Sequence, residues 1–349
     1  MHVPFQPHAR YPDPALQILD PAFLPLRLYS STLEQVASGL RWAEGPVYFP
    51  GQQGGPGHLL VSDIPGNRIL RFDETDGRFS VFRSPSNHAN GHTRDRQGRL
   101  VSCEHSVTRR ITRTEHDGTV TVLATGWQGQ RFNAPNDIVV KSDGSIWFTD
   151  PLFGIQGWWE GEPATPELPG TWVFRLDPDS GEVTPVITDL GNPNGLAFSP
   201  DERYLYVVEC RPSPWRSIWR YALSADGRTL DLAGAVRVVQ ATDHGALDGL
   251  RVDEQGNLWC GWGASSELAD APVTLNGRQV WLPAARSEDL DGVRVFSPEG
   301  RALAHLSLPE RCANLCWGGP KGNRLYMAAS HSVYAMHFNT RGAGWPDRA

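Results

Sequence analysis

The sequence predicts an all-β protein, a six-bladed β-propeller in which each blade is a four-stranded antiparallel sheet. A hairpin pattern recurs six times along the chain at intervals of roughly 45–65 residues, which is the spacing of propeller blades. The composition agrees, because 36 glycines, 28 prolines and 13 tryptophans in 349 residues are typical of many short strands joined by tight turns.

The clearest copies of the pattern begin with an asparagine or an aspartate and align without gaps. They are NGHTRDRQGRLVSCEH from Asn90, NDIVVKSDGSIWFTDP from Asn136 and DGLRVDEQGNLWCGWG from Asp248. Each has a glycine eight residues after its first residue and then a short apolar run, so each predicts a strand, a tight turn and a second strand. A fourth copy, NGLAFSPDERYLYVVE, begins at Asn194, and two less regular copies complete the set, EGPVYFP and ANLCWGGPKGNRLYMAAS.

Most copies are followed by two further strand-like runs, which complete the four strands of a blade. The last copy has only one such run, SVYAMHF. We therefore expect the segment LEQVAS, Leu33 to Ser38, to supply the missing outer strand and to close the ring. This division gives one propeller domain over residues 31–340, an N-terminal extension over residues 1–30 and a C-terminal tail over residues 341–349.

Charge and hydropathy exclude several classes of protein. The net charge of −7 argues against a nucleic-acid partner, which requires a concentrated basic face. No run approaches the roughly 20 apolar residues of a membrane helix, and the N-terminus has no apolar core of a secretory signal. The five cysteines are an odd number, and several lie in apolar strand-like runs, so we expect a reduced, cytoplasmic protein.

A polar residue leads every copy, and equivalent positions of successive blades lie at the same height around a propeller axis. Six oxygen-bearing side chains are therefore expected near one central point. Such a set suits a hard divalent cation, with Ca²⁺ favoured and Mg²⁺, Mn²⁺ or Zn²⁺ as alternatives. Turn capping would explain an asparagine or an aspartate in one copy, but it explains poorly all six copies, one of which has a glutamate. The six residues are Glu44, Asn90, Asn136, Asn194, Asp248 and Asn314.

These segments resemble those of the SMP-30/gluconolactonase family of six-bladed propellers, especially its bacterial gluconolactonases. The matching pieces run in family order over about residues 30–340 and are AEGPVYF, NGHTRDRQGRLVSCEH, NAPNDIVVKSDGSIWFTDP, PNGLAFSPDERYLYV and DGLRVDEQGNLW. The resemblance implies a monomeric or homodimeric lactonase that opens glucono-1,5-lactone or a related aldonolactone to the aldonic acid. Two alternatives stay open: an organophosphate or aryl-ester hydrolase on the same site, and a calcium-binding propeller without catalysis.

The resemblance also implies roles for residues of the repeats. Glu44, Asn194 and Asp248 match metal ligands, and Asn136 matches a residue that contacts substrate and can approach the metal. Asp248 matches the family's proposed proton acceptor and donor. Animal members have an arginine two residues before the asparagine of the third repeat, where this chain has Ala134.

Other side chains are candidates for contacts with a sugar. Sugar lactones present several hydroxyls, which amide, imidazole and guanidinium groups can bind. Asn90, His105 and Arg109 of the second repeat are the candidates, together with Asn136. Arg109 or Arg131 is also a candidate for the positive donor that Ala134 does not provide.

Lactone hydrolysis requires a polarised carbonyl, an attacking water and a stabilised oxyanion, and a cation can serve the first and the third as a Lewis acid. Asp248 then has two open roles. It takes the proton of the attacking water and returns it to the ring oxygen, or it mainly orients a water that the cation activates, because an aspartate bound to a dication is a weak base.

Two longer segments interrupt the repeats, Gly154 to Gly170 and Ala264 to Asp289. Each follows an inner hairpin, so both are expected to fold over one face, either as surface insertions or as a lid. The first contains Trp158, Trp159 and Glu160. These residues favour a lid over a central pocket and make Glu160 a candidate for the family's substrate-contacting glutamate.

Overall fold

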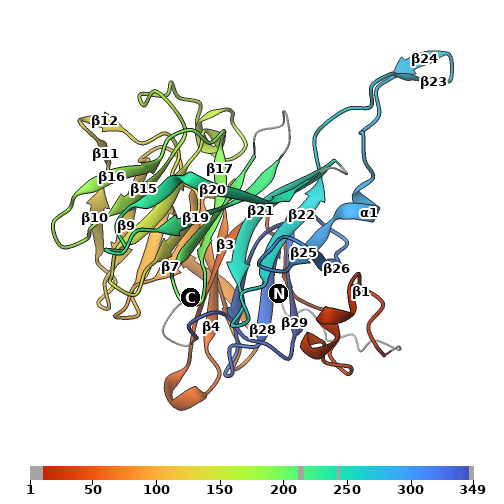
Figure 1. Ribbon diagram of the computed structural model, residues 1–349, viewed down its shortest axis with the longest axis horizontal. Coiled ribbons are helices and arrows are strands. Elements are labelled where there is room, and N and C mark those ends of the chain that lie inside the picture. The colour runs from red at the N-terminus through yellow and green to blue at the C-terminus, as the bar shows by residue number, and fades with distance from the viewer. Residues whose placement is uncertain (1–10, 211–215, 242–243, 346–349) are drawn as a thin grey trace.

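The structure is a computed structural model that describes residues 11–210, 216–241 and 244–345. Six antiparallel sheets form the blades (Figure 1), five of them with four strands and one with a fifth strand added at its outer edge. The six-bladed propeller predicted from the repeats is confirmed. Within the described residues, no helix has both the length and the apolar character needed to cross a bilayer.

Each blade is built from strands that follow one another along the chain, and the first strands of successive blades contact each other around the axis. Blades one to three comprise β3 (Ala43–Phe49), β4 (His58–Asp63), β5 (Arg68–Asp73) and β6 (Phe79–Arg83); β7 (Ala89–Arg94), β8 (Leu100–Glu104), β9 (Arg110–Thr114) and β10 (Val120–Ala124); β13 (Ile138–Val140), β14 (Ile146–Asp150), β15 (Trp172–Leu176) and β16 (Val183–Ile187). Blades four to six comprise β17 (Pro193–Phe198), β18 (Tyr204–Glu209), β19 (Ser217–Leu223) and β20 (Leu230–Gln240); β21 (Gly245–Val252), β22 (Leu258–Ala264), β25 (Gly292–Phe296) and β26 (Ala302–Ser307); β27 (Cys312–Gly318), β28 (Arg324–Ala329), β29 (Ser332–His337) and β2 (Glu34–Ser38).

The remaining elements are short and lie in connections. They are the 3₁₀ helices η1 (Pro21–Leu26), η2 (Gln52–Gly54) and η3 (Phe153–Ile155), the helix α1 (Ser287–Leu290), the hairpin β11 (Gly126–Trp127) and β12 (Gln130–Arg131), the hairpin β23 (Val273–Leu275) and β24 (Arg278–Val280), and the strand β1 (Leu16–Ile18).

The ring closes through hydrogen bonds between the two ends of the chain. Strand β2 pairs antiparallel with β29, with Gln35 opposite Tyr334 and Ser38 opposite Ser332. The N-terminal closing strand expected over Leu33 to Ser38 is therefore confirmed. Because the first and last parts of the sequence share one blade, the ring has no open seam between its first and sixth blades.

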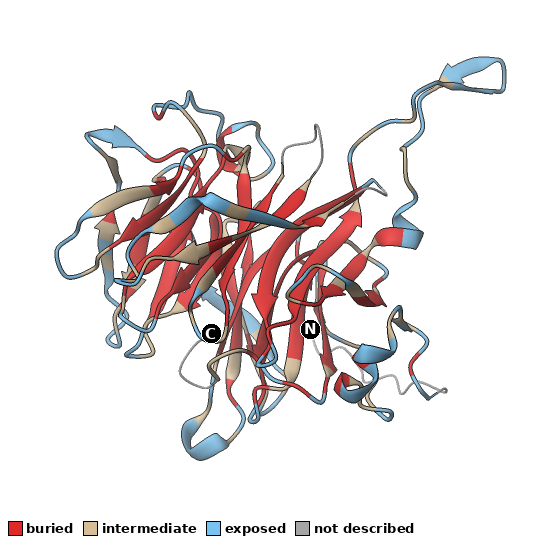
Figure 2. Ribbon diagram, viewed as in Figure 1, coloured by how far each residue is buried: buried red, intermediate tan, exposed pale blue. Residues whose placement is uncertain are grey.

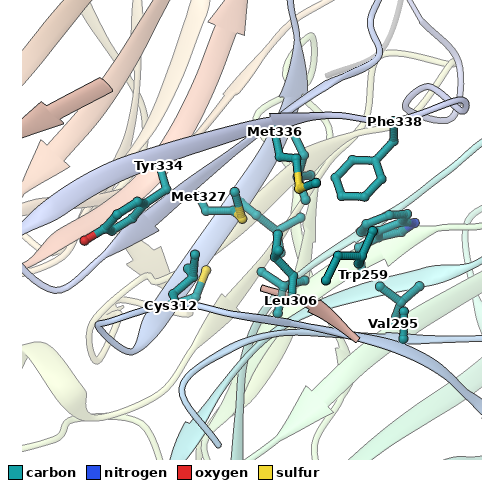
Figure 3. Packing of buried hydrophobic residues seen from close by; sticks show 14 of the residues in the cluster. Trp259, Val295, Leu306, Cys312, Met327, Tyr334, Met336 and Phe338 are labelled. Carbon is teal, nitrogen blue, oxygen red and sulfur yellow. The ribbon is translucent and has the colours of Figure 1, made fainter. Parts of the chain in front are cut away.

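Both terminal segments pack onto the propeller. Strand β1 pairs with β26 as a fifth strand of blade five, and Phe23 of η1 is fully buried. The Phe23 ring lies 5.7 Å from the Trp259 ring and 6.3 Å from the Phe338 ring, centroid to centroid. Figure 3 shows Trp259 and Phe338 facing each other in this cluster, with centroids 4.7 Å apart. Residues 11–30 therefore contribute to the core of the propeller.

Burial falls from the axis outward. All but one of the seven residues of β3 are buried, whereas β6, the outer strand of the same blade, has no buried residue. Figure 2 shows this gradient as red inner strands and paler outer strands. The inner hairpins turn at glycines in the left-handed region, such as Gly98 with φ 77° and Gly256 with φ 88°, a conformation that favours glycine. The repeated glycine of the three clearest copies therefore lies in the turn of its inner hairpin.

Candidate active site

The first strands approach one another closely because a glycine follows the leading polar residue in four blades. A Cβ on Gly45 would lie 1.8 Å from the backbone oxygen of Asn90, and one on Gly91 would lie 2.2 Å from that of Asn136. The same relation holds for Gly195, whose Cβ would lie 2.5 Å from the backbone oxygen of Asp248. These glycines permit the backbone contacts that draw the leading residues together around the axis.

Hydrogen bonds connect the leading residues of neighbouring blades. The side-chain amide of Asn194 in blade four donates to Oδ1 of Asp248 in blade five at 2.8 Å. The amide of Asn314 in blade six donates to Oε2 of Glu44 in blade one at 3.0 Å. These bonds join four of the six leading residues near the axis, at a polar centre that Asn90 and Asn136 also line and from whose cavity Asn314 is set back.

Three amide oxygens at this centre have no hydrogen-bond partner among the described residues. They are the buried Oδ1 atoms of Asn90, Asn136 and Asn194. A buried acceptor without a partner costs free energy, and a cation coordinated by these oxygens would remove that cost.

The two carboxylates of the centre are both buried. Burial raises the pKa of Glu44 well above its usual value, and the nearby carboxylates of Asp248 and Asp137 raise it further. Burial also raises the pKa of Asp248 to about 6, although the Arg311 guanidinium opposes this shift. Two buried carboxylates that repel each other require positive charge to stay ionised.

The donor set is therefore two carboxylates and several amide oxygens. Among the residues that the structure describes, no group of three or more histidines, cysteines, aspartates or glutamates could hold a metal. A set rich in neutral oxygens fits Ca²⁺ better than Zn²⁺, which favours nitrogen and sulfur ligands. Glu44, Asn136, Asn194 and Asp248 thus fit a hard divalent cation.

A cavity of about 660 Å³ opens over this centre. Its floor contains Glu44, Asn90, Asn136, Asn194 and Asp248, and its walls come from the start of β21 and from loops at the same end of the blades. The wall residues are Trp42, Phe153, Gln156, Trp159, Glu160, Cys210, Arg216, Ala246, Leu247, Ser265, Ser266, Glu267 and Arg311. The predicted central pocket therefore combines aromatic rings with polar and charged groups, as a sugar requires.

The first insertion reaches the cavity and is attached to blade two. Its Glu160 lines the cavity and bonds through Oε2 to Nε2 of His105 at 3.2 Å. Nδ1 of the same imidazole lies 2.9 Å from the carbonyl oxygen of Pro135. The backbone N–H of Glu162 donates to the Ser106 hydroxyl at 2.9 Å. Residues of the second repeat thus fix the loop that carries Glu160.

Two of the four candidates for sugar contacts lie behind the cavity wall. Asn90 and Asn136 line the cavity, but His105 and Arg109 do not. His105 is fully buried beneath the first insertion. Arg109 is also buried, and its Nε donates to the carbonyl oxygen of Phe132 at 2.6 Å. Both residues come directly after the inner hairpin of blade two in the chain. Their side chains form hydrogen bonds with neighbouring loops and not with the cavity.

A guanidinium that the sequence did not point to, that of Arg311, lies beside Asp248. Its Nη2 lies 3.2 Å from Oδ2 of Asp248, and it lines the cavity. Arg131, one of the two candidates for the positive donor that Ala134 does not provide, instead donates to the carbonyl oxygens of Val107 and Thr108. Arg311 precedes Asn314 by three residues, a signal that the irregular sixth repeat obscures.

Arg216 and Trp42 were also not identified from the sequence. Arg216 lines the cavity, and its Nη1 donates to Oε1 of Glu267 at 2.9 Å. Trp42 stands two residues before Glu44, at the entry of the first inner strand. Its nearness to the leading residue is the one signal that could have found it.

The fold and the cavity define a class of protein: a six-bladed β-propeller with a polar cavity built on the leading residues of its blades. A family model described as the SMP-30/gluconolactonase/LRE-like region matches residues 42–331. The chain belongs to this family, as the resemblance of the repeats indicated.

Individual relatives agree with this membership. A gluconolactonase of Zymomonas mobilis is 32% identical over 333 residues, which cover 90% of this chain and 83% of that protein. A pentonolactonase of Haloferax volcanii is 26% identical, with 84% of each chain covered. The solved structure of a gluconolactonase from Xanthomonas campestris is 33% identical with a TM-score of 0.77, covering 93% of this chain and 94% of that one.

Proposed function

We propose that this protein is a divalent-cation-dependent lactonase, which hydrolyses glucono-1,5-lactone or a related aldonolactone to the aldonic acid. One observation carries the proposal. Two buried carboxylates, Glu44 and Asp248, share a cavity with three amide oxygens that lack a partner among the described residues. The relatives named gluconolactonase and pentonolactonase support a lactone as the substrate.

The cation would be held by Glu44, Asn136, Asn194 and Asp248, and Ca²⁺ suits this oxygen-only set best. When bound, it supplies Lewis acidity, which polarises the lactone carbonyl and stabilises the developing oxyanion. Its charge would also balance the two carboxylates, whose pKa values burial raises, and would keep both side chains ionised.

Asp248 handles the proton. Its Oδ1 accepts from the Asn194 amide at 2.8 Å and its Oδ2 accepts from Arg311 at 3.2 Å, so the carboxylate is held in one orientation. In the reaction, a water oxygen adds to the carbonyl carbon to give a tetrahedral oxyanion, and the bond from that carbon to the ring oxygen then breaks. Asp248 accepts a proton from the water and returns it to the ring oxygen.

Arg311 contributes positive charge and N–H donors beside the reacting carbonyl. Its side chain lines the cavity and is partly exposed there, so its guanidinium can reach a bound substrate. A fixed guanidinium stabilises negative charge without reorganisation, because it is already oriented before the reaction. Arg311 therefore takes the role for which the sequence suggested Arg109 or Arg131.

The walls, together with Asn90 of the floor, bind the sugar. Asn90, Gln156 and Glu160 offer hydrogen-bonding groups for the ring hydroxyls, and Trp42 and Trp159 offer apolar surfaces. This mixture of a few polar groups and aromatic rings is the usual chemistry of a small-molecule site.

The proposal is tested by measuring acid release from glucono-1,5-lactone with protein stripped by a chelator and dialysed. We expect activity to fall to background and to return when Ca²⁺, Mg²⁺ or Mn²⁺ is added. Because the lactone also hydrolyses spontaneously, a protein-free sample with each cation is the control. Full activity in metal-free protein would contradict the cation requirement, and turnover of phosphotriesters or aryl esters but not of lactones would contradict the substrate class.

A further inference from the structure

The positions directly after the leading residues form a second column around the axis. A Cβ on Gly91 of blade two would lie 2.8 Å from Cα of Asp137 of blade three, and one on Gly249 of blade five would lie 2.8 Å from Cα of Asn314 of blade six. Asn314 leads the sixth repeat of the sequence, but in the structure it lies one position later than the other leading residues. The second column is therefore Gly45, Gly91, Asp137, Gly195, Gly249 and Asn314.

Two members of this column are not glycine, and they form the same local hydrogen bond. Oδ1 of Asp137 accepts from the N–H of Ile138 at 3.0 Å, and Oδ1 of Asn314 accepts from the N–H of Leu315 at 2.8 Å. Their other contacts differ. The Asp137 carboxylate accepts from the guanidinium of Arg251 at 3.0 and 3.2 Å, whereas the Asn314 amide donates to a carboxylate of blade one.

That carboxylate is Glu44, and Asn314 meets it in one orientation only. Because the N–H of Leu315 occupies Oδ1, the Nδ2 end of the amide faces Glu44 and donates to its Oε2 at 3.0 Å. Asn314 is fully buried and fills the space beside Gly249, where a Cβ would lie 2.2 Å from Oδ1 of Asn314. Packing and hydrogen bonding thus fix the amide.

Both hydrogen bonds of the Glu44 carboxylate involve the same oxygen. Oε2 accepts from the Asn314 amide and from the backbone N–H of Gly45. Oε1 accepts no hydrogen bond from the residues that the structure describes, and Glu44 lines the cavity. The donors on Oε2 therefore orient the carboxylate and leave Oε1 for a cation.

We propose that Asn314 is a positioning residue that holds Glu44 in the orientation that binds the cation, without being a ligand itself. The inference rests on the proposed function, because it requires a cation at the polar centre. Carboxylates that bind metals are themselves hydrogen-bonded by outer groups, whose loss typically costs about 10- to 100-fold in metal affinity. Without the Asn314 amide, Glu44 keeps only the N–H of Gly45, and cation binding has to order a more mobile side chain.

The test is Ca²⁺ binding by the full-length protein, measured by isothermal titration calorimetry after chelator treatment and dialysis. Asn314→Gly introduces the residue that four blades have at this position, so the fold tolerates it. Asn314→Ala is the second variant, without the added backbone freedom of glycine. Each should raise the Ca²⁺ dissociation constant about 10-fold or more. In lactonase assays the Ca²⁺ concentration for half-maximal rate should rise similarly, while kcat at saturating Ca²⁺ should stay within about 3-fold.

The matched control is Asn257→Ala. Asn257 is also buried, and its amide donates to both carboxylate oxygens of Asp253, at 3.1 and 2.9 Å, but neither residue lines the cavity. This variant should lower the thermal unfolding temperature about as much as Asn314→Ala and leave the Ca²⁺ dissociation constant within about 2-fold. The comparison separates the loss of a buried hydrogen bond from the loss of a ligand's orientation.

Two outcomes would overturn the positioning role alone. One is a Ca²⁺ dissociation constant within about 3-fold of wild type in both Asn314 variants, which would make Asn314 a structural residue only. The other is an equal loss of affinity in Asn257→Ala. Both leave the lactonase proposal intact. A wild-type protein that binds none of Ca²⁺, Mg²⁺ and Mn²⁺ would contradict the cation of the proposed function, and the role of Asn314 would fail with it.

Discussion

The two insertions of this propeller begin at equivalent places and end differently. Both leave the ring after the second strand of a blade, the first after β14 and the second after β22. The first returns to the axis and places Trp159 and Glu160 in the cavity wall. The second contributes Ser265, Ser266 and Glu267 and then extends away from the blades to the hairpin of β23 and β24 (Figure 1).

The two insertions differ in the hydrogen-bond partners that the blades provide for them. The first meets buried partners on blade two, where His105 bonds to Glu160 and Ser106 accepts from the backbone of Glu162. The second meets a polar partner at its base, where Arg216 and His244 bond to Glu267. The part of each insertion that lines the cavity is thus the part that hydrogen bonds hold to the blades.

This comparison assigns chemistry to the ring and only binding to the insertions, so the largest effect should come from Asp248. Asp248→Asn removes the proton acceptor while it nearly preserves side-chain size, and we expect kcat to fall about 1,000-fold or more. Acid release from glucono-1,5-lactone at saturating Ca²⁺ measures this loss. Asn90→Ala is the matched change on the floor and should cost far less. A comparable loss in the two variants would mean that Asp248 serves only to bind the cation.

The second-largest loss of activity should come from substitution of Arg311, which also belongs to the blades. Arg311→Gln removes the charge beside the carbonyl and the bond to Oδ2 of Asp248, and we expect kcat/KM to fall about 100-fold. Arg311→Lys keeps the charge but loses the planar set of donors, so it should recover only part of the activity. A glutamine variant with wild-type kcat/KM would remove Arg311 from the proposed mechanism.

Substitutions that affect the first insertion should have the next-largest effect. Glu160→Gln, and His105→Asn, which can still reach Pro135 but not Glu160, should each raise KM about 10-fold with a smaller change in kcat. Because His105 acts by holding Glu160, the double variant should be little worse than either single variant. Independent, additive losses would show that His105 does not position Glu160.

Much of the fold could be predicted from the sequence because the residues that indicate it are close together along the chain. The turn glycines, the alternating strands and the leading polar residues each occupy a few consecutive positions, and four leading residues are followed by the glycine that lets their blades approach. The features that were not predicted are placed by contacts between segments that are far apart in the sequence. Arg311 meets Asp248 only because blade six packs beside blade five, and β1 joins blade five by pairing with β26. His105 and Arg109 were expected to contact sugar, but their orientation depends on loops that no repeat encodes.

The smallest effect should come from the base of the second insertion. Glu267→Gln weakens the contact with Arg216, which lies 2.9 Å away, and frees that guanidinium to move within the cavity wall. Since neither side chain touches Asp248, we expect kcat to stay within about 2-fold and KM to rise about 3-fold. Steady-state kinetics over a series of aldonolactones measures both quantities. A kcat loss as large as that of Arg311→Gln would show that the base of the second insertion takes part in the chemistry, which would contradict the assignment of chemistry to the blades alone.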